Sequence, residues 1–147
     1  PAQGFKRFRE SPCVSVGMKR ALFVCIENSC RSQMAEGFAR NLGPDVIEPW
    51  SAGSRPSGKV NKRAVVFMKE KGIDIGVQLS KGLNDLPPGS WDYIVTMGCG
   101  DACPSLPAKK RLDWDLPYTK NLPDDEFRKV RDEIESRVKS LILESRP

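Results

Sequence analysis

The sequence contains no histidine among its 147 residues. This absence excludes serine or cysteine catalysis that relies on a histidine base, and it removes the commonest protein ligand of transition metals. A catalytic proton donor must then be a carboxylate, a thiol, a lysine or a tyrosine. Cys99 and Cys103 form a close cysteine pair, but two sulfurs without further ligands make a poor zinc site, so we expect no bound metal.

Long apolar runs are absent as well. No stretch approaches the roughly 20 residues of a membrane helix, and the N-terminus lacks the apolar core of a signal peptide. We therefore expect a cytoplasmic protein without a membrane partner. The five cysteines are odd in number, which argues against the disulfide framework of a small secreted domain and for thiols kept reduced until they react.

Aromatic residues make up only 7% of the chain, and the basic residues are scattered. Proteins that bind single-stranded nucleic acids interleave basic and aromatic side chains in one stretch, and no such pattern occurs here. We expect no nucleic-acid partner. The net charge of +5, from 24 Lys and Arg against 19 Asp and Glu, would still help to attract an anionic substrate.

The apolar pattern predicts one domain over residues 18–147, preceded by an N-terminal extension, 1–17, that shows no periodicity and carries Cys13 without a catalytic role. Strands are expected over 21–26, 46–50, 91–97 and 111–114. Helices are expected over 34–42, around 60–68 and from residue 123 onward, with an irregular stretch over 79–88. Strands separated by helices favour parallel pairing, so we expect a three-layer α/β sandwich with its site at the carboxyl edge of the sheet.

The first expected strand runs through a tight turn into the first helix, and this turn contains Cys25 and Arg31 in a Cys-x5-Arg spacing. A loop that ends at a helix start points backbone N–H groups inward and can hold a tetrahedral oxyanion. The same field favours a thiolate, so Cys25 is the candidate nucleophile, and the forked Arg31 can bind two oxygens of the anion. The expected binding residues are Ile26, Glu27, Asn28, Ser29, Cys30, Arg31 and Ser32.

An alternative interpretation treats Cys25 and Cys30 as small buried side chains beside a structural turn. The position of the motif between a strand and a helix favours the nucleophile. The loop over residues 51–58, rich in Gly, Ser and Pro, follows the second expected strand. Because it leaves the same edge of the sheet, we expect it to lie beside the Cys25 turn and to support it.

Residues 25–38 resemble the low-molecular-weight protein tyrosine phosphatase superfamily, whose phosphate loop reads Cys-x4-Cys-Arg-Ser. The stretch from Asn28 to Phe38 is more similar to the arsenate reductases built on that fold. The resemblance covers Lys19 to about Leu143 and implies a four-stranded parallel sheet in the order 2-1-3-4. It implies reduction of arsenate without a bound cofactor, with thioredoxin or a small-thiol system as external reductant. Tyrosine phosphatase activity and a noncatalytic oxyanion or thiol sensor are the alternatives.

Cys99 and Cys103 follow the third expected strand in a Gly-rich loop. The resemblance implies that they are the second and third redox cysteines, with Cys25 attacking arsenate, Cys99 attacking Cys25, and Cys103 attacking Cys99. Their spacing is more compact than is common in thioredoxin-coupled members, which leaves the electron donor open. The alternative is a structural loop with two incidental cysteines.

The family places its catalytic acid in an Asp-Pro pair before the last helix, and Tyr118-Thr119 stands at that position here. The nearest carboxylates are Asp113 and Asp115, and we take Asp115 as the candidate acid. Lys81 occupies a position where some of these reductases carry an aspartate that supports a bound potassium ion. This departure leaves open whether the chain requires a monovalent cation.

Overall fold

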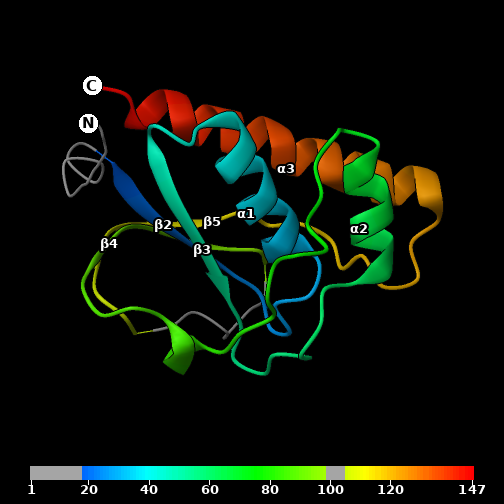
Figure 1. Cartoon of the computed structure of the whole chain (residues 1–147), viewed down its shortest axis with the longest axis horizontal. Coiled ribbons are helices and arrows are strands. Elements are labelled where there is room, and N and C mark those ends of the chain that lie inside the picture. The colour runs from blue at the N-terminus through cyan, green and yellow to red at the C-terminus, as the bar shows by residue number, and fades with distance from the viewer. Residues whose placement is uncertain (1–17, 99–104) are drawn as a thin grey trace, which may run out of the picture.

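A computed structural model describes residues 18–98 and 105–147 (Figure 1). The expected N-terminal extension with Cys13, and the predicted redox cysteines Cys99 and Cys103, lie outside these described residues. Within the two described ranges, no helix combines the length and the apolar character that crossing a bilayer would require.

The sheet has four parallel strands in the order β3-β2-β4-β5. In chain order this is 2-1-3-4, so the predicted topology is confirmed. The strands are β2 (Lys19–Val24), β3 (Ile47–Ala52), β4 (Trp91–Thr96) and β5 (Ala108–Asp113). The helices are α1 (Arg31–Leu42), α2 (Lys62–Lys69), the short 3-10 helix η2 (Leu83–Asp85) and α3 (Asp124–Ser145).

Alternation along β2 divides the core into two parts. Ala21 and Phe23 face the side covered by α1, α2 and α3, where the larger apolar cluster lies. Leu22 and Val24 face the other side, where η2 and its flanking segments cover a smaller cluster. Figure 1 shows the three long helices together on one side of the sheet and η2 on the opposite side. Successive side chains of a strand point to opposite faces, so a fully buried strand supports both layers.

Each strand differs from its predicted range by one to three residues at one end or at both. β2 ends at Val24, so Cys25 already belongs to the turn. β3 continues through Ser51 and Ala52, which pair with Phe23 and Val24 and were predicted as loop. β5 begins at Ala108, three residues before its predicted start. It is an edge strand, and an edge strand tolerates charged side chains such as the basic run 109–111. Because this run is polar, the apolar pattern did not predict it as part of a strand.

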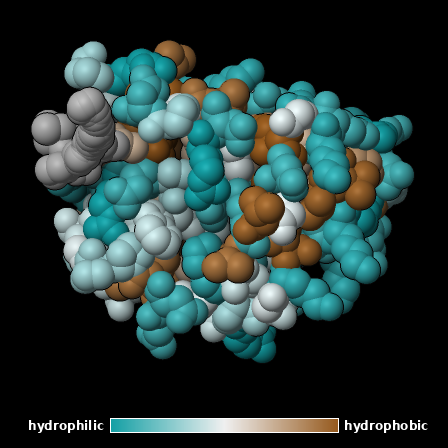
Figure 2. Space-filling view, in the orientation of Figure 1, coloured by the Kyte–Doolittle hydropathy of each residue, from teal (hydrophilic) through white to brown (hydrophobic). Residues whose placement is uncertain are grey.

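The most exposed large apolar side chains of the described residues include Val77 and Leu79, in the segment between α2 and η2. Figure 2 shows hydrophobic side chains gathered over this segment, on a face that is otherwise largely hydrophilic. Neither residue lines the cleft described below. The apolar surface and the candidate site are therefore separate features.

Candidate active site

The site lies where the carboxyl ends of the four parallel strands meet. β2 leads into the turn of residues 25–31, which we name the anion loop, and α1 begins at its last residue, Arg31. β3 leads to Gly53 and β4 to Met97, while β5 leads to the segment 114–120. Open α/β sheets keep their ligand sites at this edge.

The carbonyl groups of the anion loop point outward into the supporting loop that follows β3. The carbonyl oxygens of Ile26, Glu27 and Ser29 accept hydrogen bonds from backbone N–H groups. The donors are Arg55, Ser57 and Asn61, at 2.9, 3.0 and 2.7 Å. Because the N–H and C=O of a peptide unit point in opposite directions, this arrangement turns loop amides toward the interior, as an anion-binding nest requires. The predicted support from residues 51–58 thus has a physical basis.

Asn28 holds the anion loop from within. Its backbone has a φ of 49°, in the left-handed region that asparagine tolerates better than most residues, and it is fully buried. Its side-chain oxygen accepts from Gln33 Nε2 at 2.9 Å and from the backbone N–H of Lys81 at 2.8 Å. Its Nδ2 donates to Ser32 Oγ at 2.9 Å. All these partners fix the orientation of the Asn28 amide.

Ser32 connects this network to the candidate nucleophile. Its Oγ lies 3.0 Å from Cys25 Sγ. Since Ser32 Oγ already accepts from Asn28, its own proton is available for the sulfur. The buried Cys25 side chain is thus held in the anion loop by the same network that fixes the Asn28 amide.

Arg31 is almost fully buried at the start of α1. Its guanidinium donates to the carbonyl oxygens of Met97, at 2.5 Å, and Leu116, at 3.0 Å. The guanidinium carbon lies 4.6 Å from the centroid of the Tyr118 ring. Backbone atoms after β4 and β5 and one aromatic ring therefore hold the positive charge at the anion loop.

Gly53 is the point of closest approach between the two loops. A Cβ placed there would lie 2.4 Å from the Ile26 carbonyl oxygen, 2.5 Å from that of Cys25 and 2.9 Å from the Asn28 nitrogen. All three are backbone atoms, so they cannot yield as the tip of a flexible side chain would. Only glycine allows the β3 loop to support the anion loop this closely.

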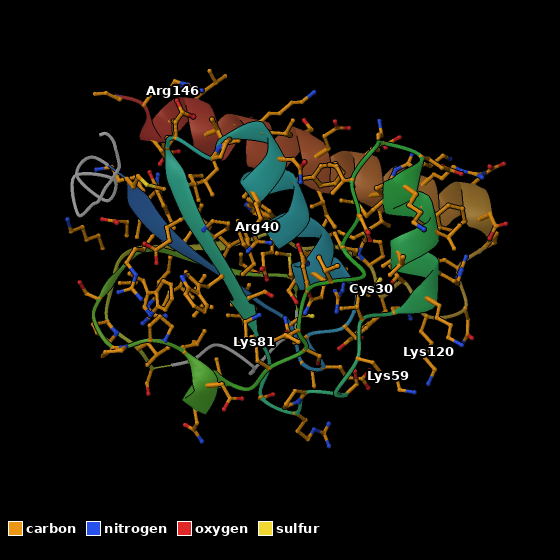
Figure 3. The ribbon with its side chains drawn as sticks, in the orientation of Figure 1. Cys30, Arg40, Lys59, Lys81, Lys120 and Arg146 are labelled. Carbon is orange, nitrogen blue, oxygen red and sulfur yellow. The ribbon has the colours of Figure 1, made fainter. Side chains whose placement is uncertain are left out.

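A buried carboxylate lies behind the loop. Glu36 of α1 accepts hydrogen bonds from Ser51 Oγ and from Arg40, whose NH2 is 2.6 Å away. Lys81 Nζ lies 3.6 Å from Glu36 Oε1, and the Lys81 backbone reaches Asn28. Figure 3 shows Arg40 beside α1 and Lys81 near the carboxyl end of β3. The charge of Glu36 is thus countered by side chains of the protein itself.

A cleft of about 370 Å³ opens over the anion loop. Among the predicted binding residues, Asn28 and Ser32 lie behind its wall, where their side chains hold the loop. Asp115 is exposed and does not line the cleft. The described residues hold no cluster of three or more side chains suited to a metal ion. The lining residues are Cys25, Ile26, Glu27, Ser29, Cys30, Arg31, Arg55, Asn61, Tyr118, Thr119 and Lys120.

Tyr118, Thr119 and Lys120 were not predicted as site residues. Their place was recognised in the sequence only as the position of a missing Asp-Pro pair. Thr119 is buried, and its hydroxyl donates to Cys30 Sγ at 3.1 Å. Figure 3 places Cys30 at the start of α1, with Lys59 and Lys120 at the same end of the molecule. The segment after β5 thus forms one wall of the cleft.

Cys30 differs from Cys25 in its surroundings. Burial raises the pKa of the Cys30 thiol to about 11, although the hydrogen bond from Thr119 opposes this shift. At neutral pH Cys30 is therefore protonated. A buried protonated thiol is a poor nucleophile, so this second cysteine of the loop serves packing and the contact with Thr119.

We expect Cys30 in the folded protein to resist iodoacetamide at pH 7 to 9 and to react only as the pH approaches its raised pKa of about 11. Thiolate is the reactive form, and a raised thiol pKa keeps that form rare below this range. Peptide mapping by mass spectrometry after timed alkylation measures the rate at this residue. The urea-unfolded chain is the control and should react readily near pH 9; equal rates in both states at pH 8 would contradict the assignment.

Comparisons with known proteins agree with this fold. A glutaredoxin arsenate reductase from Synechocystis sp. is 38% identical over 128 residues, which span 85% of this chain and 97% of the relative. A solved arsenate reductase in the phosphate binding state matches with a TM-score of 0.80 at 38% identity, covering 86% of this chain and 98% of that one. A thioredoxin-dependent arsenate reductase from Corynebacterium glutamicum matches with a TM-score of 0.72 at 29% identity, covering 90% and 67%.

The resemblance to arsenate reductases inferred from residues 28–38 is thereby confirmed over most of the chain. The family described as low molecular weight phosphotyrosine protein phosphatase matches residues 20–146. Apart from Lys19, the first residue of β2, this range contains all four strands, the anion loop and the wall formed by the segment after β5. The chain belongs to the low molecular weight phosphotyrosine protein phosphatase family.

Proposed function

We propose that this protein reduces arsenate to arsenite with electrons from its own cysteine thiols. The observation that carries the proposal is the cleft that both Cys25 and Arg31 line. Within it, Cys25 Sγ lies at hydrogen-bond distance, 3.0 Å, from Ser32 Oγ. The anion loop is shaped for a tetrahedral oxyanion, and arsenate has this shape and charge. The named activity of the relatives supports arsenate as the substrate.

In the first step the Cys25 thiolate attacks arsenic. A sulfur–arsenic bond forms, one arsenic–oxygen bond breaks, and the departing oxygen leaves as water after taking up a proton. Arg31 and the loop amides balance the negative charge that accumulates on the remaining oxygens. Arsenic is still As(V) after this step, so a source of two electrons is required.

Cys99 supplies the next thiolate. It attacks Cys25 Sγ, a Cys25–Cys99 disulfide forms, and the electron pair of the sulfur–arsenic bond stays on arsenic, which leaves as arsenite. Cys103 then attacks Cys99 and releases the Cys25 thiolate. Both cysteines lie outside the described residues, but Met97, two residues before Cys99, is described. The Met97 N–H donates to the Val24 carbonyl at 3.2 Å, and the Met97 carbonyl accepts from Arg31. This placement at the anion loop supports the relay.

The Cys99–Cys103 disulfide is reduced by an external thiol protein or small thiol. Relatives named for thioredoxin and for glutaredoxin both occur, and we propose thioredoxin as the physiological donor. An assay with arsenate, NADPH and each complete reducing system compares them directly. Arsenate-dependent NADPH consumption supports the reductase. Phosphate release from an aryl phosphate without reductant would identify a phosphatase, and activity in neither assay would leave an oxyanion or thiol sensor.

We expect Cys103→Ser to accumulate the Cys25–Cys99 disulfide after one treatment with arsenate, because the variant lacks the thiol that resolves it. Non-reducing mass spectrometry of the digested variant measures this linkage. Cys13→Ser, which removes a thiol with no expected role, is the matched control and should end with the Cys99–Cys103 disulfide. If Cys103→Ser shows no Cys25–Cys99 linkage, the order of the relay is wrong.

A further inference from the structure

The first step of the proposed reaction needs a proton for the departing oxygen. The titratable side chains that line the cleft are Cys25, Glu27, Cys30, Arg31, Arg55, Tyr118 and Lys120. Cys25 is the nucleophile, and arginine does not release a proton in proteins. Glu27 has an exposed carboxylate side chain. Cys30 is buried, and its sulfur accepts a hydrogen bond from the Thr119 hydroxyl. Tyr118 and Lys120 remain as donors among the described lining residues.

Of these two donors, Tyr118 is the one whose ring packs against the Arg31 guanidinium. Its ring centroid is 4.6 Å from the guanidinium carbon of Arg31. The Tyr118 ring therefore packs against the same cation that would bind the oxyanion. Tyr118 is also 59% exposed, so solvent can return its proton after each turnover.

Two contacts hold the Tyr118 segment to the anion loop. On one side the Leu116 carbonyl accepts from Arg31 at 3.0 Å. On the other side the Thr119 hydroxyl donates to Cys30 Sγ at 3.1 Å. Tyr118 lies between these two tethers, so the backbone that carries its ring is held against the anion loop. A catalytic group needs such fixed placement more than it needs burial.

We propose that Tyr118 is the catalytic proton donor of the arsenate reaction, in the place where the family carries an aspartate. This inference rests on the proposed function. As the Cys25 sulfur–arsenic bond forms and an arsenic–oxygen bond breaks, the Tyr118 hydroxyl gives its proton to the leaving oxygen, which departs as water. The phenolate stays beside Arg31 until solvent reprotonates it.

Stacking alone is the competing role, and Tyr118→Phe separates the two because it keeps the ring and removes only the hydroxyl. We expect arsenite release in a single turnover, with enzyme in excess over arsenate, to slow by about 100-fold, the lower range for loss of general acid catalysis. Phosphate affinity measured by calorimetry should stay within about twofold, because the Arg31 contacts remain. Alkylation of Cys25 by iodoacetamide should keep its rate, because iodide leaves without a proton.

Tyr93→Phe is the matched control, since the sequence holds only two tyrosines and the Tyr93 hydroxyl lies 3.3 Å from Glu144 Oε2 of α3, outside the cleft lining. It should release arsenite at the wild-type rate. A wild-type rate in Tyr118→Phe would overturn the proposal, as would a loss confined to Asp115→Asn, which would assign the acid to Asp115. Absence of arsenate turnover in the wild-type protein would instead overturn the proposed function itself, and this inference with it.

Discussion

Cys25→Ser is expected to abolish arsenate-dependent turnover while the protein still binds phosphate. The serine hydroxyl is isosteric with the thiol but remains protonated at neutral pH, so the attacking group is lost and every later disulfide step is lost with it. We expect a decrease of roughly 10⁴-fold or more, as for other enzymes that lose their nucleophile. Arsenite release is measured in the coupled assay and by direct detection of the product.

Phosphate binding is expected to survive because the Cys25 side chain does not hold the anion loop in place. The loop is held by Asn28, by Gly53 and by outward carbonyl contacts such as that of Ser29 with Asn61 at 2.7 Å. Calorimetric titration of Cys25→Ser with phosphate measures this directly. Cys13→Ser is again the matched control, with full turnover expected. Residual arsenate reduction by Cys25→Ser above the rate of the buffer would assign the nucleophile to another thiol.

Gly53→Ala is expected to lower kcat/KM by about 100-fold, the cost of a displacement of roughly 1 Å at a catalytic group. The new methyl group would meet the Ile26 carbonyl oxygen at 2.4 Å and the Cys25 carbonyl oxygen at 2.5 Å. Backbone on both sides must then separate, and the anion loop has to open. Overpacking of this kind also costs about 1–3 kcal/mol of folding free energy, which urea unfolding measures.

Gly82→Ala is the matched control for this substitution. Gly82 pairs with Gly53 in an isolated parallel bridge, and its φ of −89° suits any residue. A Cβ there would have Asp85 Oδ2 as its nearest neighbour, at an ordinary contact distance of 3.5 Å. We expect this variant to keep its activity and its stability. Similar behaviour of the two alanine variants would show that the close approach at Gly53 has no role in shaping the loop.

The sequence predicted the fold where a pattern is local and repeated. The apolar spacing around Phe38 and the series from Phe127 to Ile142 marked α1 and α3, because a helix face repeats over several turns. The boundaries of β3 and β5 were less accurate. Whether Ser51 pairs with Phe23 depends on the neighbouring strand, and this information is not contained in the segment itself.

The candidate site was likewise predicted only where its residues belong to one local motif. Cys25 and Arg31 could be identified because their spacing and their position at a strand-to-helix turn are properties of one segment. The wall formed by Tyr118 and Thr119 could not, because irregular chain after a strand has no period from which the direction of a side chain follows. Asp115 was chosen as the nearest carboxylate in sequence, yet it lies outside the cleft lining.

The anion loop draws its contacts from segments that follow every strand of the sheet, from Gly53 after β3 to Leu116 after β5. Such a binding site exists only in the completely folded chain, so an oxyanion cannot recognise a partly unfolded form. Occupancy and global unfolding are then thermodynamically linked, and an oxyanion present at 100 times its Kd adds about 2.7 kcal/mol to the free energy of unfolding. If the loop binds arsenate as proposed, phosphate that competed for it would at the same time protect the protein against thermal denaturation.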